Sequence, residues 1–152
     1  MTNKEYVLDA MRRQGKAIAM AVQSASATMT GTELNAEAEY IPEFLKAREN
    51  QNMITRKAGM TDGFVCRSSA GRVVRLIQNY DSSIYADEPE ALPAQWGFVW
   101  SDDPAHAKPF VAIATSPYQK GNCCTENGIT YRSLIDNNVF APSDLPDGWA
   151  KI

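Results

Sequence analysis

Apolar and polar positions in the first part of the chain alternate with a helical period. Within residues 4–25, mostly apolar or small side chains recur alternately every four and three residues, at Val7, Met11, Gln14, Ile18 and Ala21. This spacing averages about 3.5 residues, the period that lets helices pack side by side and supercoil. Thr2 and Asn3 are candidate N-caps. The pattern predicts a helix that lies on its own domain, self-associates or docks on a partner, and these five residues are the candidate oligomerisation residues.

The texture of the chain changes after this helix. Residues 24–39 are rich in Ser, Ala, Thr and Gly, which predicts a connector. From residue 40 onward, short alternating apolar stretches are separated by Gly, Pro, Asn and Asp, the pattern of short strands and tight turns. Asn127-Gly128 between apolar residues is the strongest short signal for a hairpin, and residues 68–71 form a looser turn of the same kind.

This strand texture occurs twice. Each copy runs from a Gly to a Cys, turns, continues from a second Gly to an Arg, passes two prolines in a polar loop and closes with Trp. The first copy contains Gly63, Cys66, Gly71, Arg75, Pro89, Pro93 and Trp96. The second copy contains Gly121, Cys124, Gly128, Arg132, Pro142, Pro146 and Trp149. The copies differ mainly by a loop insertion, so we interpret residues 40–152 as two homologous modules.

The predicted fold class is mainly β with an N-terminal α-helix, as two tandem small antiparallel β modules after a helical stalk. The predicted boundaries are a docking or oligomerisation helix at 1–29, a first module with its lead-in at 30–101, a linker at 102–109 and a second module at 110–152. The Asp-Pro and Lys-Pro steps of the linker favour extended backbone. Because modules this small are near the lower limit for independent folding, we expect them to share contacts, with Trp96 and Trp149 as core plugs.

Charge and hydropathy narrow the class of protein. The chain has 15 basic and 18 acidic residues, a net charge of −3, whereas nucleic-acid binders normally carry a basic surface. No apolar run approaches the ~20 residues that span a bilayer. Charges scattered through the N-terminus do not match a secretory signal peptide. We therefore expect synthesis in the cytoplasm, no nucleic-acid partner and no membrane insertion.

The three cysteines point to buried free thiols. Cys123 and Cys124 are adjacent, so on a strand their side chains lie on opposite faces and neither bridge readily nor share a metal. The sequence has no Cys-x-x-Cys, and its one histidine, His106, leaves a zinc site short of ligands. We expect no metal and no other cofactor.

Catalytic signatures are also weak. His106 falls in the predicted linker, away from a nucleophile that it could activate. Two carboxylate pairs, Glu88 with Glu90 and Asp102 with Asp103, are neighbours in loops and lack the opposed geometry of glycoside hydrolysis. No Gly-rich phosphate loop precedes a helix. The sequence therefore predicts a protein that is not an enzyme.

The repeat resembles the small chitin-binding modules appended to bacterial chitinases. The residues that carry this resemblance are 118–121, 128–131, Asn137, Asn138, Pro142, Pro146 and Trp149. More broadly, residues 30–152 resemble tail proteins of phages and prophages of Gram-positive hosts, often described as carbohydrate-binding. That resemblance is carried by residues 31–34, 41–42, 80–83, Trp96, 103–110, 123–124 and 131–138. Phe140 stands where that family tends to carry Trp, and the first copy has Val74 where the second has Tyr131.

The resemblance implies a virion protein of the tail or baseplate that attaches to the host surface. Sugar binding needs flat aromatic faces against which the apolar face of a pyranose packs, with polar groups for its hydroxyls. The candidate carbohydrate-binding residues are Tyr80, Tyr85, Trp100, Tyr118, Phe140, Asn137 and Asn138. The aromatics alternatively pack against the neighbouring module or a second protomer, and the asparagines alternatively only shape a turn.

Two non-catalytic functions remain open from the sequence. In the first, the protein binds host cell-wall polysaccharide through exposed aromatics. In the second, it is an architectural virion protein, such as a collar, baseplate or head decoration, whose β modules bind other virion proteins. In both, the N-terminal helix docks the protein on the particle or forms a homo-oligomer, for which we expect a trimer.

Overall fold

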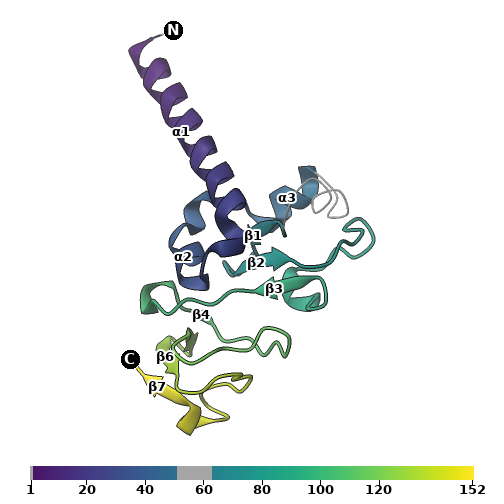
Figure 1. The fold of residues 1–152 in the computed structure, drawn as a ribbon, viewed down its shortest axis with the longest axis vertical. Helices are drawn as coiled ribbons and strands as arrows, with labels where there is room; N and C mark the ends of the chain where they lie inside the picture. Colours follow the sequence, from purple (N-terminus) through teal and green to yellow (C-terminus); the bar gives the residue numbers. More distant parts are fainter. Residues whose placement is uncertain (1, 51–62) are drawn as a thin grey trace.

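The computed structural model describes residues 2–50 and 63–152, which form a long N-terminal helix, several short helices and two small sheets. Figure 1 shows α1 projecting from the body, the first sheet beneath it and the second sheet at the far end. The predicted fold class, mainly β after an N-terminal helix, with two largely antiparallel modules, is confirmed. The predicted first module includes residues 51–62, which lie outside the described residues.

The predicted N-terminal helix is confirmed as α1, Asn3–Ala25. Of the two candidate caps, Thr2 is the N-cap. Its hydroxyl accepts a hydrogen bond from the Glu5 backbone N–H at 3.2 Å, and the Glu5 carboxylate accepts one from the Thr2 backbone at 2.7 Å. This reciprocal capping box satisfies two amide donors that the first turn would otherwise leave free.

The C-terminal end of α1 fixes the helix to the body. Val22 is buried, and Ile18 packs against the same cluster as Val65 and Val73. The side-chain amide of Gln23 donates to the Val65 carbonyl at 2.6 Å and accepts from the Val65 N–H at 3.0 Å. Gln23 thereby pairs with the outer edge of the first strand as a neighbouring strand would.

Residues 24–39, predicted as a connector of loop composition, instead fold into short helices. They form η1 (Ser26–Thr28), α2 (Gly31–Ala36) and most of η2 (Ala38–Tyr40). Leu34 is fully buried, and the Asn35 side chain donates to the carbonyls of Gly31 and Val99. Part of the Ser- and Thr-rich composition serves helix capping. Thr30 is the N-cap of α2, and its hydroxyl accepts a hydrogen bond from the Glu33 N–H at 3.1 Å.

Two helical glycines should respond to alanine with opposite signs. A Cβ on Gly31 would lie 2.1 Å from the Trp100 carbonyl oxygen, whereas a Cβ on Gly15 would meet no atom within 4 Å. Gly31→Ala should cost about 1–3 kcal/mol, because α2 must move away from backbone. Gly15→Ala should stabilise α1 by about 1 kcal/mol through helix propensity. Urea unfolding measures both, and a Gly31→Ala variant as stable as the wild type would contradict this close approach.

The remaining elements form two sheets preceded by α3 (Phe44–Asn50). The first sheet has the order β1 (Val65–Arg67), β2 (Val73–Leu76), β3 (Trp96–Phe98), with antiparallel pairing throughout. The second has the order β4 (Lys108–Pro109), β5 (Cys123–Glu126), β6 (Ile129–Ser133), β7 (Trp149–Lys151), with β4 parallel to β5. The predicted Asn127-Gly128 hairpin is confirmed: both residues have positive φ, as a two-residue turn of this kind requires.

The two sheets have the same register, so the sequence repeat is a structural repeat. In each, the middle strand pairs with a hairpin partner and with a last strand that begins at Trp. The equivalent pairs are Cys66↔Val74 and Cys124↔Tyr131, then Leu76↔Trp96 and Ser133↔Trp149. A short helix precedes each last strand, η3 (Pro89–Ala91) in the first module and η5 (Pro146–Gly148) in the second. Both tryptophans are buried, as predicted.

The prediction of a linker at 102–109 is wrong, because this segment belongs to the repeat. It contains η4 (Pro104–His106) and β4, which runs parallel to β5. In the first module η2 and a parallel bridge between Glu43 and Arg67 occupy the equivalent places. The following phenylalanine then packs edge-on against the module's tryptophan in both copies: Phe44–Trp96 at 5.7 Å and Phe110–Trp149 at 6.1 Å.

One hydrophobic core joins the two sheets. Its buried residues include Trp96 and Phe98 from the first sheet and Cys124 and Trp149 from the second. Stacked rings run between them, with centroid distances of 5.6 Å for Phe98–Trp100, 4.2 Å for Trp100–Tyr118 and 5.4 Å for Phe110–Tyr118. The modules therefore share their largest apolar contacts, as the sequence led us to expect.

Candidate functional site

Three of the seven candidate carbohydrate-binding residues are core aromatics, which corrects the prediction of exposed platforms. Tyr80 is 7% exposed, Trp100 8% and Tyr118 1%. The Tyr80 hydroxyl accepts the Trp96 indole N–H at 3.0 Å, and the Trp100 indole donates to the Ser116 carbonyl at 2.9 Å. Rings held this way seal the core between the modules, so their faces are closed to a polysaccharide.

Asn138 is also buried, with 0% exposure. Its side-chain NH₂ donates to the Ser133 hydroxyl at 3.1 Å, and its carbonyl oxygen accepts from the Phe140 N–H at 3.2 Å. Its backbone exchanges two hydrogen bonds with Tyr118, at 2.9 and 2.8 Å. Asn138 therefore organises the loop between β6 and β7, and the alternative that it shapes a turn holds.

Phe140 lies at the surface and is the best placed candidate for ligand contact. Its side chain is 54% exposed. Its carbonyl accepts the Trp149 indole N–H at 2.8 Å, and its own N–H is held by Asn138. Hydrogen bonds to Asn138 and Trp149 thus fix the backbone of Phe140, while its ring remains largely in solvent. The ring is therefore a preorganised aromatic surface.

Tyr80 and Phe140 have the same hydrogen-bonding role in their modules, although the strand register does not make them equivalent residues. Each accepts the indole N–H of its module's tryptophan, Tyr80 through its hydroxyl and Phe140 through its carbonyl. In the first module the ring must point inward to deliver that oxygen. In the second module the acceptor is the backbone carbonyl of Phe140, so the Phe140 ring can face outward. The Phe140 ring is therefore exposed, whereas the Tyr80 ring is buried.

The other two candidates, Tyr85 and Asn137, are exposed as well. Tyr85 is 57% exposed and follows a turn in which its N–H donates to the Asp81 carbonyl at 2.9 Å. Asn137 has a φ of 54°, and its N–H donates to the Gln119 side chain at 3.0 Å. Its side-chain oxygen accepts a long 3.4 Å bond from the same glutamine, so its amide group remains available to a ligand.

Exposed aliphatic side chains accompany these residues in the loops that follow β2 and β6. They are Ile77 and Ile84 in the first module and Leu134 and Ile135 in the second. Ile77 and Leu134 are equivalent, each coming directly after the strand that pairs with the tryptophan strand. Sequence reasoning missed this set because it considered aromatics alone. An apolar residue continuing past the end of a strand was the available signal.

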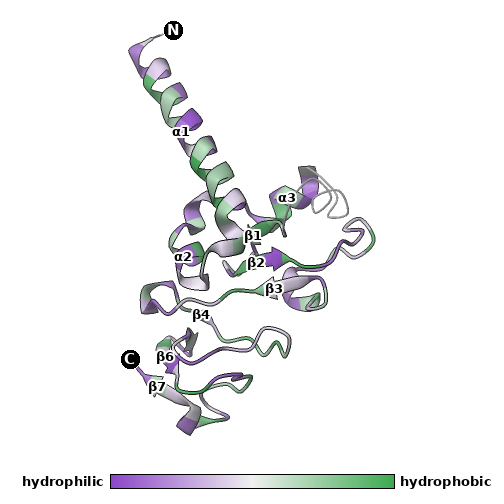
Figure 2. Ribbon diagram, viewed as in Figure 1, coloured by the Kyte–Doolittle hydropathy of each residue, from purple (hydrophilic) through white to green (hydrophobic). Residues whose placement is uncertain are grey.

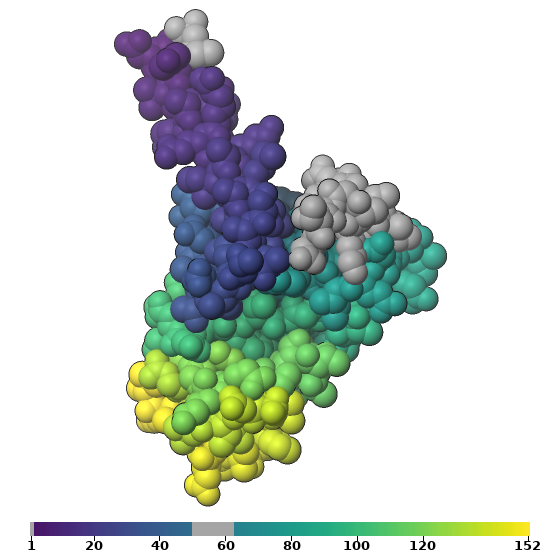
Figure 3. All heavy atoms as spheres, in the orientation of Figure 1, coloured from purple at the N-terminus to yellow at the C-terminus, as the bar shows by residue number. Residues whose placement is uncertain are grey.

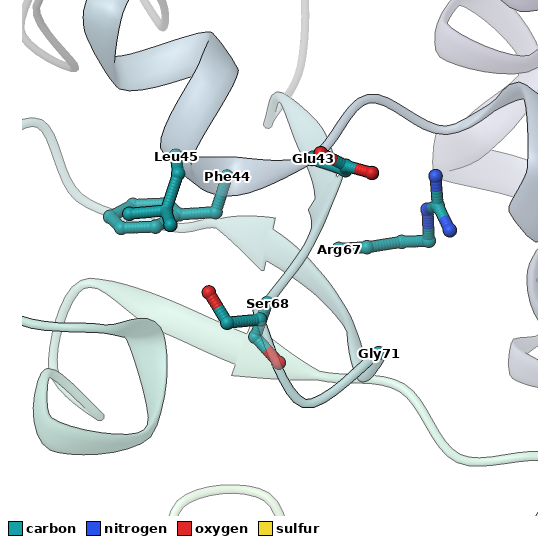
Figure 4. A pocket seen from close by; sticks show the side chains of 7 residues that line it. Glu43, Phe44, Leu45, Arg67, Ser68 and Gly71 are labelled. Carbon is teal, nitrogen blue, oxygen red and sulfur yellow. The ribbon is translucent and has the colours of Figure 1, made fainter.

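A pocket of about 280 Å³ lies between the start of α3 and the β1–β2 turn. Figure 4 shows the apolar side chains of Phe44 and Leu45 on one side and serine hydroxyls on another. Its charged groups already have partners: the Arg67 Nε donates to the Ile41 carbonyl at 2.9 Å, and Glu43 lies 3.8 Å from Lys46. The charged groups that line this pocket are therefore engaged within the chain.

The thiols are buried and free, as predicted. Burial raises the pKa of Cys124 to about 12 and also raises the pKa of Cys123. A thiol with a raised pKa is protonated at neutral pH and is a poor nucleophile. In residues 2–50 and 63–152, no cluster of three or more His, Cys, Asp or Glu side chains has the arrangement of a metal site.

The candidate oligomerisation residues divide into two groups along α1. Val7 is 55% exposed and Met11 62% exposed, and Gln14 and Ala21 are exposed as well. Ile18 packs partly against the body. Within the described chain, no helix has the length and apolar character to cross a bilayer.

Comparison with protein-family models, with curated proteins and with solved structures gives no match for this chain.

Proposed function

We propose that this protein is a non-catalytic attachment protein of a bacteriophage, prophage or tailocin particle, located at the tail or baseplate. It is made in the bacterial cytoplasm and assembles with other virion proteins. Its ligand is the host cell-surface polysaccharide, and its N-terminal helix provides the multivalent or docked arrangement. The resemblance of residues 30–152 to phage tail proteins motivates the class, and the loop geometry supports the mode of binding.

The observation that carries the proposal is the outward ring of Phe140, whose backbone is fixed at both its N–H and its carbonyl. A pyranose packs its C–H face on such a ring, and burial of apolar area supplies the affinity. The exposed amide of Asn137 lies in the same loop and suits a sugar hydroxyl. Because the ring is held in place beforehand, little conformational entropy is lost on binding. Tyr85 offers a second aromatic contact from the first module.

Phe140→Ala should weaken binding to host cell wall by about tenfold or more, since about 1.4 kcal/mol of lost apolar contact corresponds to a factor of ten. Phe140→Trp should bind at least as well as the wild type, because the ring becomes larger. Ile152→Ala is the matched control, since Ile152 is also 54% exposed. Co-sedimentation with purified walls and titration calorimetry with wall oligosaccharides measure the effect.

Thermal unfolding should give nearly the same midpoint for Phe140→Ala and the wild type, because more than half of Phe140 is exposed. Equal wall binding by both proteins would exclude the Phe140 surface as the site. A wild-type protein that binds no wall fraction would exclude polysaccharide attachment altogether.

A second function is favoured by the aliphatic residues of the same loops. Ile77, Leu134 and Ile135 are 48%, 46% and 40% exposed, and branched aliphatic groups suit a protein surface better than a sugar face. In that case the protein is an architectural virion component whose modules bind other virion proteins. Absence of wall binding, together with co-assembly on the particle that Leu134→Ser abolishes, would identify this function.

A further inference from the structure

The first two-thirds of α1 project from the body with an apolar face uncovered. Figure 3 shows the helix standing clear of the other described atoms in that view, and Figure 2 shows hydrophobic residues recurring along its length. At 1.5 Å per residue the 23-residue helix is about 34 Å long. The N-cap hydrogen bonds and the Arg13–Asp9 ion pair of this part of α1 join residues of the helix and its cap to one another. Most of the stability of a helix in a protein comes from packing of its amphipathic face, so a partner for this face would stabilise α1.

We call this surface the stalk face and define it as Val7, Leu8, Met11, Gln14 and Gly15. At 100° per residue these five positions span about 120° of the helix. Asp9, Arg12, Arg13 and Lys16 lie on the opposite side. Association through the stalk face therefore leaves these four charges in solvent, and Lys4, which falls within the same arc, lies at the N-terminal tip of the helix.

The stalk face continues an interface that the chain already makes. Ile18 and Val22 lie on the same side of α1, one and two turns further along, and they pack against Leu34, Val65 and Val73. The same side of α1 is thus covered by the chain's own body at its base and uncovered above it. The uncovered part keeps the spacing of a helix that packs on a helix.

We infer that three copies of this chain associate through the stalk face as a parallel helical bundle. Two heptad seams share Met11 and Ile18 and diverge by one residue, through Val7 and Gln14 in one and Leu8 and Gly15 in the other. A face that is two seams wide meets two neighbouring helices, whereas a two-helix coil uses a single narrow seam.

The parallel direction follows from the covered base. In an antiparallel pair the N-terminal turn of one copy would have to pack beside Ile18 and Val22 of the other, where the body already covers the helix. In a parallel bundle the contacts stay within the projecting part, and all β modules lie at one end. Gln14 then meets its own counterparts near the axis, a single polar layer of the kind that fixes register.

The test uses the full chain and two methionines of equal exposure. Met11 lies on the stalk face and Met20 on the opposite side, and each is 62% exposed. Sedimentation equilibrium should give about three times 16.8 kDa for the wild type and for Met20→Lys, and a monomer for Met11→Lys. Met11→Lys should also lose helical circular dichroism at 222 nm while keeping the thermal transition of the β modules.

A Lys4→Cys variant reports the direction, because equivalent cysteines at the tip meet only in a parallel bundle and the native thiols are buried. It should oxidise to a disulfide-linked pair within the trimer. A monomeric wild type would overturn the inference and favour docking on another virion protein. A dimer or tetramer, or a Met11→Lys variant that stays trimeric, would overturn it as well. Monomeric Met11→Lys should keep the wild-type affinity per site for a wall oligosaccharide, so this result is separable from the fate of the polysaccharide proposal.

Discussion

Replacing Trp96 with alanine should lower the free energy of unfolding by about 3–5 kcal/mol, the range for deleting a large buried aromatic. The indole has 0% exposure. Phe44 and Tyr80 pack edge-on against it at 5.7 and 6.2 Å. The substitution opens a cavity beneath α3 and also leaves the buried Tyr80 hydroxyl without the indole donor.

Urea unfolding followed by far-ultraviolet circular dichroism measures this loss. Ile84→Ala is the control, since Ile84 is 70% exposed and its truncation should change stability by less than about 0.5 kcal/mol. Trp96→Phe should fall between the two, because it keeps part of the ring volume and loses the indole N–H. A Trp96→Ala protein within about 1 kcal/mol of the wild type would show that this tryptophan does not hold the first module together.

The repeat was predictable because turn chemistry and strand chemistry are local. Asn127-Gly128 requires two positive φ angles that few other pairs adopt, so the hairpin and its register follow from two residues. The spacing from Gly128 to Arg132, matched by Gly71 to Arg75, then places equivalent residues on equivalent strands. The burial of both tryptophans follows from their size and their position on a closing strand.

The full extent of the repeat was not predictable from this local pattern. The proline-containing segment before Phe110 predicts an extended linker. Pro109 instead lies in a two-residue edge strand, where its missing N–H is tolerated. Its counterpart in the first module is the bridge at Glu43, and eight more residues separate Phe44 from Cys66 than Phe110 from Cys124. That insertion hides the correspondence of the two phenylalanines, which only the shared packing on tryptophan reveals.

Of the seven candidate site residues, Phe140, Tyr85 and Asn137 are exposed, whereas the other four are buried. Aromatic rings in loops of a small protein have two favourable environments, solvent with a ligand or a shared core. Sequence position does not separate them. Trp100 and Tyr118 stack at 4.2 Å because two modules with small individual cores gain more from burying these rings together. The choice is made by packing between segments that are distant in sequence.

Replacing Tyr118, which packs between the two modules, should lower the free energy of unfolding as much as replacing Trp96. Its ring is 1% exposed and touches Trp100, Phe110 and Trp149, which come from both modules. Tyr118→Ala should therefore cost about 3–5 kcal/mol and should destabilise both sheets together. Tyr118→Phe is the matched control, because it keeps the ring and removes only a long 3.4 Å bond from the Val111 N–H, at a cost of about 1 kcal/mol or less.

The cooperativity of that unfolding distinguishes a shared core from two independent ones. Backbone amides of β2 report the first sheet and those of β6 the second, so their NMR signals follow each module separately in urea with all three tryptophans in place. In the wild-type and Tyr118→Phe backgrounds, the two probes should give the same transition midpoint, since one buried cluster spans both sheets. In Tyr118→Ala the common midpoint should move to lower urea, because both sheets lose the same shared core contacts. Two well-separated transitions already present with Tyr118 intact would mean that the stacked rings touch without coupling the modules energetically.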